Sequence, residues 1–428
     1  MRDGRVRASG LVAVAVGLVL AVVAVAGAAG RAGLDASYGE GGVATVPVPG
    51  PVGPDTGTGP FSEIFGFAGA DDGSAYVLGN LRSCGDACRD GRFLLRLDGR
   101  GHLEGGFAGD GRLELAPGFG YTVGADAAGR ALVADLRADR RAIVVRRFKL
   151  DGSVDRGFGR AGRVSVPCPR CGDRFVAIHL LRSPGGRILL DVNVPESRRR
   201  SRARLFRLLP DGRPDRGFGR AGTTSFALPP SLPRGVAVGG DGAVLLGGSV
   251  CCGTHRIYLV RVTPGGEVDR RFDRAAASSA RERGLGESPL LRAVVPGPGG
   301  GLVAVGETDD RRGFYLRLNR RGRQASGVGR HGLVRLPMIV GSAVRGVGGA
   351  TFVIGKPNPY GDYRALRILA DGRADPGYGG WAGLRVPLSG GPARAVAAGA
   401  GRVLVTDPGY TGCRQYCRAH PAIARFVE

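Results

Sequence analysis

Two stretches of the sequence are almost identical: DGSVDRGFGRAGRVSV (residues 151–166) and DGRPDRGFGRAGTTSF (residues 211–226). Each begins with an Asp-Gly turn, continues through a second Asp to a Phe-Gly pair, and ends in a run that suits a β-strand. The Gly of the turn suits a position with positive φ, and the Asp side chain can bond the backbone of its own turn. We call this stretch the repeat phrase.

The repeat phrase recurs along the chain, and its aromatic residue gives the spacing. The equivalent positions are Tyr38, Phe107, Phe158, Phe218, Phe272 and Tyr378, with Val328 in the weak sixth copy. By subtraction of these numbers, successive copies lie 50 to 69 residues apart. This recurrence indicates one supersecondary unit used seven times. The fifth copy departs from the others, because Phe272-Asp273 replaces the Phe-Gly pair and a stretch rich in Arg, Ala and Ser follows.

Three short apolar runs lie between copies, as in residues 175–181, 187–194 and 202–209. A turn containing Gly joins the first two runs in every unit, and a fourth run such as residues 164–166 follows the Gly pair. These are signals of antiparallel strands, and no segment outside the N-terminus shows a sustained helical period. We predict an all-β fold, a seven-bladed β-propeller of four-stranded antiparallel blades. A β-solenoid is the alternative, although solenoids usually repeat with shorter periods.

The two ends of the chain fit a closed ring. The first copy carries only a fourth strand, at residues 43–46, whereas the last unit, after Leu388, has three apolar runs and lacks a fourth. We therefore expect the N-terminal strand to complete the last blade, which removes the unpaired sheet edges of an open array.

This pattern resembles the delta-60 repeat family, whose units have the form L-x-x-D-G-x-x-D-x-x-F-G-x-x-G followed by a strand. The matching residues are Leu150-Asp151-Gly152, Asp155, Phe158-Gly159 and Gly162, and in the next copy Asp211-Gly212, Asp215, Phe218-Gly219 and Gly222. The resemblance covers nearly the whole chain after its N-terminal segment. It implies a propeller-type fold in an exported bacterial-type protein. It implies no catalytic residues, because the motif consists of turn and packing residues.

The N-terminus predicts export. Arg2, Arg5 and Arg7 precede an uncharged run, Leu11–Ala29, which ends in Ala-x-Ala sites. This is the form of a secretory signal peptide. We predict a signal peptide at residues 1–28, a single propeller domain at residues 29–428, and a secreted or cell-surface protein. An uncleaved membrane anchor is the alternative, because about 19 apolar residues can just span a bilayer, and contact with a membrane is expected only in that case.

The eight cysteines form four close pairs: Cys84/Cys88, Cys168/Cys171, Cys251/Cys252 and Cys413/Cys417. An even number of cysteines in an exported chain predicts disulfides. Three pairs lie in loops between second and third strands, and Cys168/Cys171 lies between a fourth strand and the next blade. In a meander these loops emerge on one face, which we call the long-loop face. The opposite, short-turn face carries the Gly turns and the repeat phrase.

Local pairing is the simplest connectivity for three of the four pairs. Neighbouring Cα atoms such as those of Cys251 and Cys252 lie ~3.8 Å apart, below the usual ~4.4 Å minimum for a disulfide. Cys84/Cys88 and Cys413/Cys417 belong to neighbouring units of a closed ring and could instead bridge each other. A zinc site at Cys168, Cys171, Cys251 and Cys252 is a further alternative, but the spacing lacks a second CxxC.

The formal net charge is +24, and all but two of the 61 basic residues are arginine. The densest basic run is residues 197–204, and its candidate anion-binding residues are Arg198, Arg199, Arg200, Arg202 and Arg204. Arginine forks suit phosphate and carboxylate, so polyanions are expected partners. A coding bias toward arginine is the alternative explanation. Aromatic residues make up only 6% and no nucleic-acid motif is present, so specific nucleic-acid recognition is not expected.

Catalytic motifs are sparse. The five histidines fall in different units, and no GxSxG, HExxH or P-loop sequence is present. His179 alternates with apolar residues in a first strand, which favours a core or channel-lining role, and the only Trp, in residues 377–383, is expected to pack within its repeat phrase. We expect no catalytic residue, metal ligand or cofactor.

We therefore predict a monomeric, non-enzymatic binding module for a protein, a glycan or an anionic cell-envelope polymer. The alternative is a propeller enzyme of the lactonase or lyase type with a site at the mouth of the central channel. Three or more acidic or His side chains converging there would favour that alternative.

Overall fold

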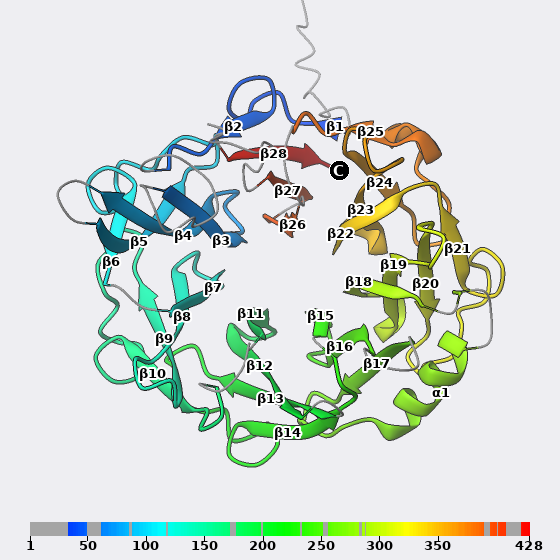
Figure 1. Cartoon of the computed structure of the whole chain (residues 1–428), viewed down its shortest axis with the longest axis horizontal. Helices are drawn as coiled ribbons and strands as arrows, with labels where there is room; N and C mark the ends of the chain where they lie inside the picture. The colour runs from blue at the N-terminus through cyan, green and yellow to red at the C-terminus, as the bar shows by residue number, and fades with distance from the viewer. Residues whose placement is uncertain are drawn as a thin grey trace, which may run out of the picture. The chain divides into compact units, whose positions relative to one another are not determined.

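The structure is a computed structural model, and it describes residues 33–48, 61–84, 88–116, 119–171, 177–197, 200–231, 233–250, 256–281, 285–286, 288–388, 394–399, 401–407 and 421–428. They belong to one compact unit, Ala32–Glu428. Within this unit, seven antiparallel sheets surround a central axis, and the first strand of each sheet lies innermost (Figure 1). The protein is a seven-bladed β-propeller, as the repeat predicts. The expected signal peptide lies outside the described residues.

The first three blades are four-stranded meanders. Blade 1 consists of β3 (Phe61–Gly69), β4 (Ala75–Cys84), β5 (Cys88–Leu97) and β6 (Arg112–Leu115). Blade 2 consists of β7 (Phe119–Ala125), β8 (Ala131–Leu136), β9 (Ala142–Phe148) and β10 (Arg163–Pro167). Blade 3 consists of β11 (Ala177–Ser183), β12 (Arg187–Ser197), β13 (Arg200–Leu208) and β14 (Thr223–Leu228).

The remaining blades vary this plan. Blade 4 has β15 (Pro233–Val238), β16 (Val244–Ser249) and β17 (Ile257–Val262), followed by the helix α1 (Arg270–Arg281). Blade 5 has β18 (Leu290–Pro296), β19 (Leu302–Glu307), β20 (Gly313–Leu318) and β21 (Leu333–Leu336). Blade 6 has β22 (Ile339–Arg345), β23 (Thr351–Lys356), β24 (Arg364–Ile368) and β25 (Leu384–Arg385). Four short 3₁₀ turns are η1 (Pro298–Gly300), η2 (Val347–Gly349), η3 (Pro376–Tyr378) and η4 (Gly380–Ala382).

Both ends of the described unit build blade 7. Its strands are β26 (Arg394–Ala397), β27 (Arg402–Asp407) and β28 (Ala422–Val427), and β28 also pairs with β1 (Gly33–Leu34) and β2 (Val43–Thr45). In the β2–β28 ladder, Val43 lies opposite Ala424 and Thr45 lies opposite Ala422. The expected closure of the ring by the N-terminal strand is therefore confirmed.

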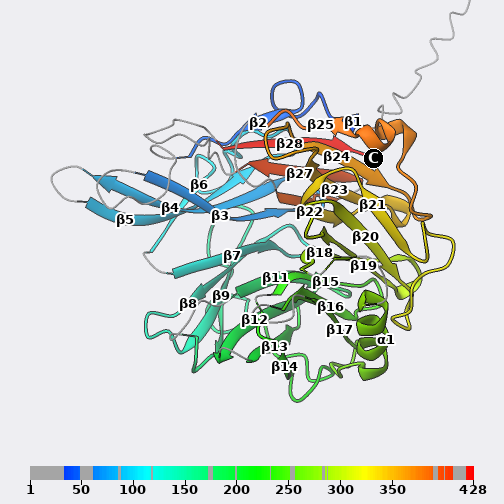
Figure 2. The ribbon, with the colours of Figure 1, turned by 45° about the vertical axis from the view of Figure 1, so that its right-hand side comes forward.

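The helix α1 corrects the expectation of a fourth strand in blade 4. It lies beside β17 in both views of the ribbon (Figures 1 and 2). Asp269, the equivalent of Asp155 in this copy of the repeat phrase, caps the helix by accepting a hydrogen bond from the Phe272 amide at 3.0 Å. Where most copies have a Gly with positive φ, this copy has Asp273 and then an Ala-rich segment that favours a helix. Phe272 and Ala276, one turn apart, are both buried.

The hydrophobic core is divided among the seams between blades. The described residues form seven buried clusters, and each cluster contains one of the seven equivalent residues of the repeat phrase. These residues are at most 1% exposed: Tyr38, Phe107, Phe158, Phe218, Phe272, Val328 and Tyr378. In each unit, this residue of the repeat phrase therefore packs in the core between two blades, as expected of a packing residue.

An arginine near the end of each third strand links neighbouring blades. These residues, which we call the arginine ring, are Arg96, Arg147, Arg207, Arg261, Arg317, Arg367 and Arg425. Arg207 donates through Nη1 to the Pro264 carbonyl oxygen of the next blade at 2.6 Å. It also donates through Nε to Asp215 at 2.8 Å and lies over the Phe218 ring, 4.5 Å from its centroid. One guanidinium thus joins a strand, a repeat phrase and the following blade.

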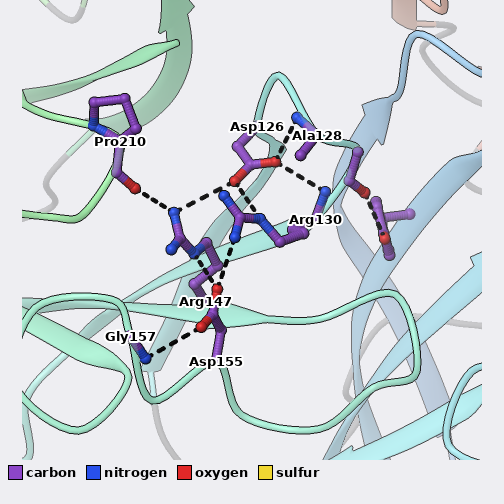
Figure 3. Close-up of polar contacts among 9 residues, drawn as sticks. Asp126, Ala128, Arg130, Arg147, Asp155, Gly157 and Pro210 are labelled. Atoms are coloured by element: carbon purple, nitrogen blue, oxygen red, sulfur yellow. Dashed lines mark hydrogen bonds and ion pairs between the residues drawn. The ribbon is translucent and has the colours of Figure 1, made fainter.

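Figure 3 shows the same arrangement around Arg147. Its guanidinium bonds Asp155 at 2.8 Å and the Pro210 carbonyl oxygen, and Arg130 reaches the same carboxylate at 3.0 Å. Burial lowers the pKa of Arg147, an effect that the neighbouring carboxylates oppose. A buried guanidinium is stable only when it is paired and hydrogen-bonded. The second Asp of the repeat phrase is thus a partner for a buried arginine.

The acceptor in each link stands three residues after the arginine of the next blade. In six seams it is a backbone carbonyl oxygen, from Leu150, Pro210, Pro264, Arg320, Ala370 or Gly99. In the seam between blades 6 and 7 the equivalent residue is Glu428, and Arg367 donates to its side-chain carboxylate at 3.2 Å. The arginine ring therefore spans all seven seams.

Candidate functional site

Of the predicted arginine run, the structure describes Arg200, Arg202 and Arg204. Arg198 and Arg199 lie outside the described residues. Arg200 is exposed at the start of β13, whereas Arg204 is half-buried. Arg202 forms a two-pronged ion pair with Glu196, and Arg170 lies 3.6 Å from the same carboxylate. The Arg202 hydrogen bond, followed by the charges of its neighbours, lowers the pKa of Glu196, so part of the positive charge is neutralised within the loop.

The cysteines support a structural role. Cys168 and Cys171 form a disulfide, and both residues are buried in the seam between blades 2 and 3. This bond leaves no thiolate at that pair for the zinc alternative. Cys84 and Cys88 lie opposite each other in the β4–β5 ladder. Cys251, Cys252, Cys413 and Cys417 lie outside the described residues.

The wall of the central channel is built mainly from small residues. At one level of the first strands, counted through the sheet register, the residues are Gly66, Thr122, His179, Gly235, Ala293, Ser342 and Arg394. Neighbouring first strands approach closely here, because a Cβ on Gly235 would lie 2.5 Å from the Val294 nitrogen. Within the described ranges, no group of three or more His, Cys, Asp or Glu side chains could hold a metal.

His179 and Arg394 are the two large polar residues at this level, and His179 has a carboxylate partner. Its Nδ1 lies 3.0 Å from Oδ2 of Asp191, its partner across the β11–β12 ladder, and Asn193 donates to the same oxygen at 2.6 Å. Asp191 is fully buried, and its other carboxylate oxygen has no hydrogen-bond partner. In the other blades the equivalent residues are Leu78, Ala134, Gly247, Val305, Ile354 and Thr406. A carboxylate that orients an imidazole is an acid–base arrangement, and the repeat does not require it.

A groove between blades 5 and 6 brings cations and an aromatic ring together. Its lining residues are Arg311, Arg312, Arg335, Leu336, Pro337, Met338, Pro357 and Trp381, and its volume is about 600 Å³. Arg311 and Arg312 occupy the turn between β19 and β20, Arg335 and Leu336 end β21, and Pro337 and Met338 connect β21 with β22. We call this feature the Arg–Trp groove.

Glycines allow the floor of the groove to lie close to the sheets. A Cβ on Gly313 would lie 2.6 Å from the Met338 carbonyl oxygen, and one on Gly355 would lie 2.7 Å from the Met338 sulfur. Met338 and Leu336 are consequently buried, whereas Trp381 is 44% exposed. The expected packing of this Trp within its repeat phrase is only partial, and Tyr378 fills the buried aromatic position of that phrase.

Positive charge exceeds negative charge among the groove's polar side chains. Arg312 pairs with Asp310 at 3.3 Å, and both side chains are more than half exposed. The Thr308 hydroxyl, and after it the Arg312 and Arg335 guanidinium groups, lower the pKa of Asp310. Asp310 thus interacts with two of the groove's three arginines, Arg312 and Arg335.

Sequence reasoning missed this groove because it followed the longest arginine run. One signal was present in the sequence. Gly162 stands four positions after Phe158, whereas Gly383 stands five positions after Tyr378. The longer segment forms η4 and carries Trp381.

Comparisons with known proteins were made for sequence and for fold. The chain matches no protein-family profile and no curated protein sequence. Among solved structures, the β-propeller domain of the Trilobed protease from Pyrococcus furiosus has 9% identity and a TM-score of 0.46, with 81% of this chain and 91% of that chain covered. The PQQ-bound aldose sugar dehydrogenase from Streptomyces coelicolor has 10% identity and a TM-score of 0.40, with 90% and 97% covered.

A third similar structure is the periplasmic gluconolactonase PpgL from Pseudomonas aeruginosa. It has 15% identity and a TM-score of 0.41, with 72% of this chain and 82% of that chain covered. Likenesses at this level carry no argument about activity, substrate or partner.

Proposed function

We propose that the protein is an exported, non-enzymatic propeller that binds an anionic polymer of the cell envelope through its long-loop face. The Arg–Trp groove is the observation that carries this proposal. Three arginines line it, and two of them, Arg311 and Arg312, stand together on an exposed hairpin turn. Arginine forks match carboxylate and phosphate groups.

The arginine ring supports this reading by separating scaffold arginines from surface arginines. Arg147 and Arg207 are buried and bonded within the fold, so they account for part of the high arginine content without any ligand. Arg311 and Arg312 make none of the links between blades. Their positive charge faces solvent, where it attracts polyanions.

The compartment is part of the proposal. The buried Cys168–Cys171 disulfide suits an oxidising environment outside the cytoplasm. No helix in the described part of the chain is long and apolar enough to cross a membrane.

Retention on isolated cell envelope tests the proposed function. We expect retention to weaken steeply between low and high salt, because exposed charges are screened within about 10 Å at 0.1 M ionic strength. Arg311→Gln/Arg312→Gln should elute at lower salt than the unmodified protein. Arg320→Gln/Arg321→Gln is the matched control, since this neighbouring pair lies exposed on the short-turn face of the same blade. Retention that is equal at all salt concentrations would contradict the proposal.

The His179–Asp191 pair favours a second candidate function, a propeller enzyme of the lactonase or lyase type. In that case His179 acts as general base at the channel wall and Asp191 holds its imidazole in position. The test is hydrolysis of a panel of lactones. This candidate requires activity that disappears in His179→Gln while the melting temperature stays unchanged.

A further inference from the structure

We infer that the Arg–Trp groove is a saccharide site for a carboxylate-bearing sugar polymer, with Trp381 stacked on a sugar ring and Arg311 and Arg312 paired with carboxylates. The inference rests on the proposed function, which requires only attraction to a polyanion. It adds the chemical class of the ligand and a role for Trp381.

Trp381 is accessible to a ligand. It is the only Trp of the chain, it lies on η4, and 44% of its surface is exposed. The buried aromatic role of its repeat phrase belongs to Tyr378, which packs edge-on against Phe352 at 5.4 Å between ring centroids. An exposed indole beside a recess offers a flat apolar surface with a polar N–H at one edge.

The floor of the groove is apolar, and such a surface favours the binding of a sugar ring over that of a phosphate ion. Leu336 and Met338 are at most 4% exposed, and Pro337 and Pro357 complete the lining. The C–H face of a pyranose ring is apolar, and its edge carries hydroxyl groups. A ring that stacks on Trp381 and contacts this floor removes apolar surface from water, a gain that a phosphate ion lacks.

Arg311 and Arg312 favour a ligand that carries negative charge. Arg311 has a φ of +58°, so the turn between β19 and β20 is tight and presents two adjacent guanidinium groups. Planar carboxylates accept paired hydrogen bonds from such forks. The exposed Arg312–Asp310 pair is the kind of surface pair that contributes little to folding, so a ligand carboxylate can replace Asp310 at low cost.

A sugar acid polymer fits these features better than a nucleic acid or a membrane. Proteins that bind single-stranded nucleic acid present several stacking platforms in succession, whereas this groove is lined by one aromatic ring. A membrane surface calls for an apolar face flanked by basic residues on an amphipathic element, whereas the apolar residues here lie at the bottom of a recess.

The single Trp makes the test direct, because tryptophan emission reports on Trp381 alone. The purified protein is titrated with a galacturonic acid hexamer and, separately, with maltohexaose, inorganic phosphate, an oligothymidylate and phosphatidylglycerol vesicles. We expect a saturable change in emission with the acidic hexamer, at an affinity about tenfold or more above that for maltohexaose.

Variants separate the two contributions, with affinities measured by calorimetry. Trp381→Ala and Arg311→Gln/Arg312→Gln should each weaken binding of the acidic hexamer about tenfold, and Trp381→Phe should retain most of it. Arg320→Gln/Arg321→Gln should bind like the unmodified protein. Because these residues are exposed, unchanged melting temperatures will show that the variants fold.

The possible failures are distinguishable. If the acidic hexamer binds equally well to Trp381→Ala, or if phosphate, the oligonucleotide or vesicles change the emission as strongly, the saccharide inference is overturned and the proposed function stands. If no polyanion binds and retention on the cell envelope does not change with salt concentration, the proposed function itself is contradicted.

Discussion

Arg425 in β28 donates a hydrogen bond from Nη1 to the backbone carbonyl oxygen of Gly99, a residue 326 positions away in the sequence. The same guanidinium bonds Asp35 at 2.8 Å and lies over the Tyr38 ring at 4.5 Å. One buried side chain therefore connects blade 7, the N-terminal repeat phrase and blade 1.

Replacing Arg425 should weaken the whole ring. Arg425→Met leaves the Asp35 carboxylate and the Gly99 carbonyl without their partner, and breaking a buried ion pair costs about 3 kcal/mol. Chemical denaturation will measure the free energy of unfolding. As a control, Arg373→Gln removes a pair whose arginine side chain is 79% exposed and should change stability by less than about 0.5 kcal/mol. Equal effects of the two substitutions would show that the arginine ring is not a stabilising element.

Glu428 should stabilise the seam between blades 6 and 7. Its carboxylate accepts hydrogen bonds from Arg367 at 3.2 Å and from the Val347 amide at 2.6 Å. Both hydrogen bonds end on Oε2, so Glu428→Ala removes both of them and should cost about 2 kcal/mol. Glu428→Gln keeps one acceptor oxygen, so its loss should be smaller. We expect the lowest melting temperature for Glu428→Ala, a higher one for Glu428→Gln and the highest for the unmodified protein. An unchanged melting temperature for Glu428→Ala would contradict the link.

Asp273 should make stability depend on pH. Burial, and then the nearby charge of Asp269, raise the pKa of Asp273 to about 6, although the Arg261 amide opposes the shift. A carboxyl group whose pKa is higher in the folded than in the unfolded state stabilises the fold most below pH 4. That contribution is lost as the pH rises through about 6.

Asp273→Asn should therefore stabilise the protein at pH 8 by about 1 kcal/mol, after allowance for partial solvation of the site. At pH 4 the variant and the unmodified protein should have the same melting temperature. Parallel stability curves for the two proteins from pH 4 to pH 8 would show that Asp273 titrates normally.

Deleting residues 30–50 should destabilise all seven blades and not only blade 7. The deletion removes β1, β2 and the fully buried Tyr38, and it exposes the edge of β28. We expect one cooperative transition at a lower denaturant concentration. A shortened chain that melts like the full chain would contradict a role of this segment in ring closure.

Several elements could be predicted from the sequence because each depends on local signals. The repeated aromatic positions gave the number of blades, and the unequal strand counts at the two ends gave the closure at β2 and β28. The repeat phrase around Phe272 predicts a fourth strand in blade 4, and this prediction is wrong because the helix α1 forms there. Its Asp269 serves as a helix cap, and Ala-rich residues follow, so that helix propensity outweighs the repeat.

The arginine ring and the groove were harder to predict for a physical reason. An arginine stands at the same place in all seven third strands, but composition alone does not distinguish a buried arginine from an exposed one. Arg207 and Arg312 differ only in what the fold brings near them. The groove depends on how closely the segment at Met338 approaches two sheets, which is a tertiary distance.

The links of the arginine ring have a consequence for how such a chain can change over generations. Six of the seven acceptors are main-chain carbonyls, and they come from residues as different as Leu150, Pro210 and Gly99. Any amino acid supplies that oxygen, so a duplicated or shuffled unit would join its new neighbours without a matching partner side chain. The seam at Glu428 is the exception. There the acceptor is a side-chain carboxylate, so the link depends on which amino acid stands at that position.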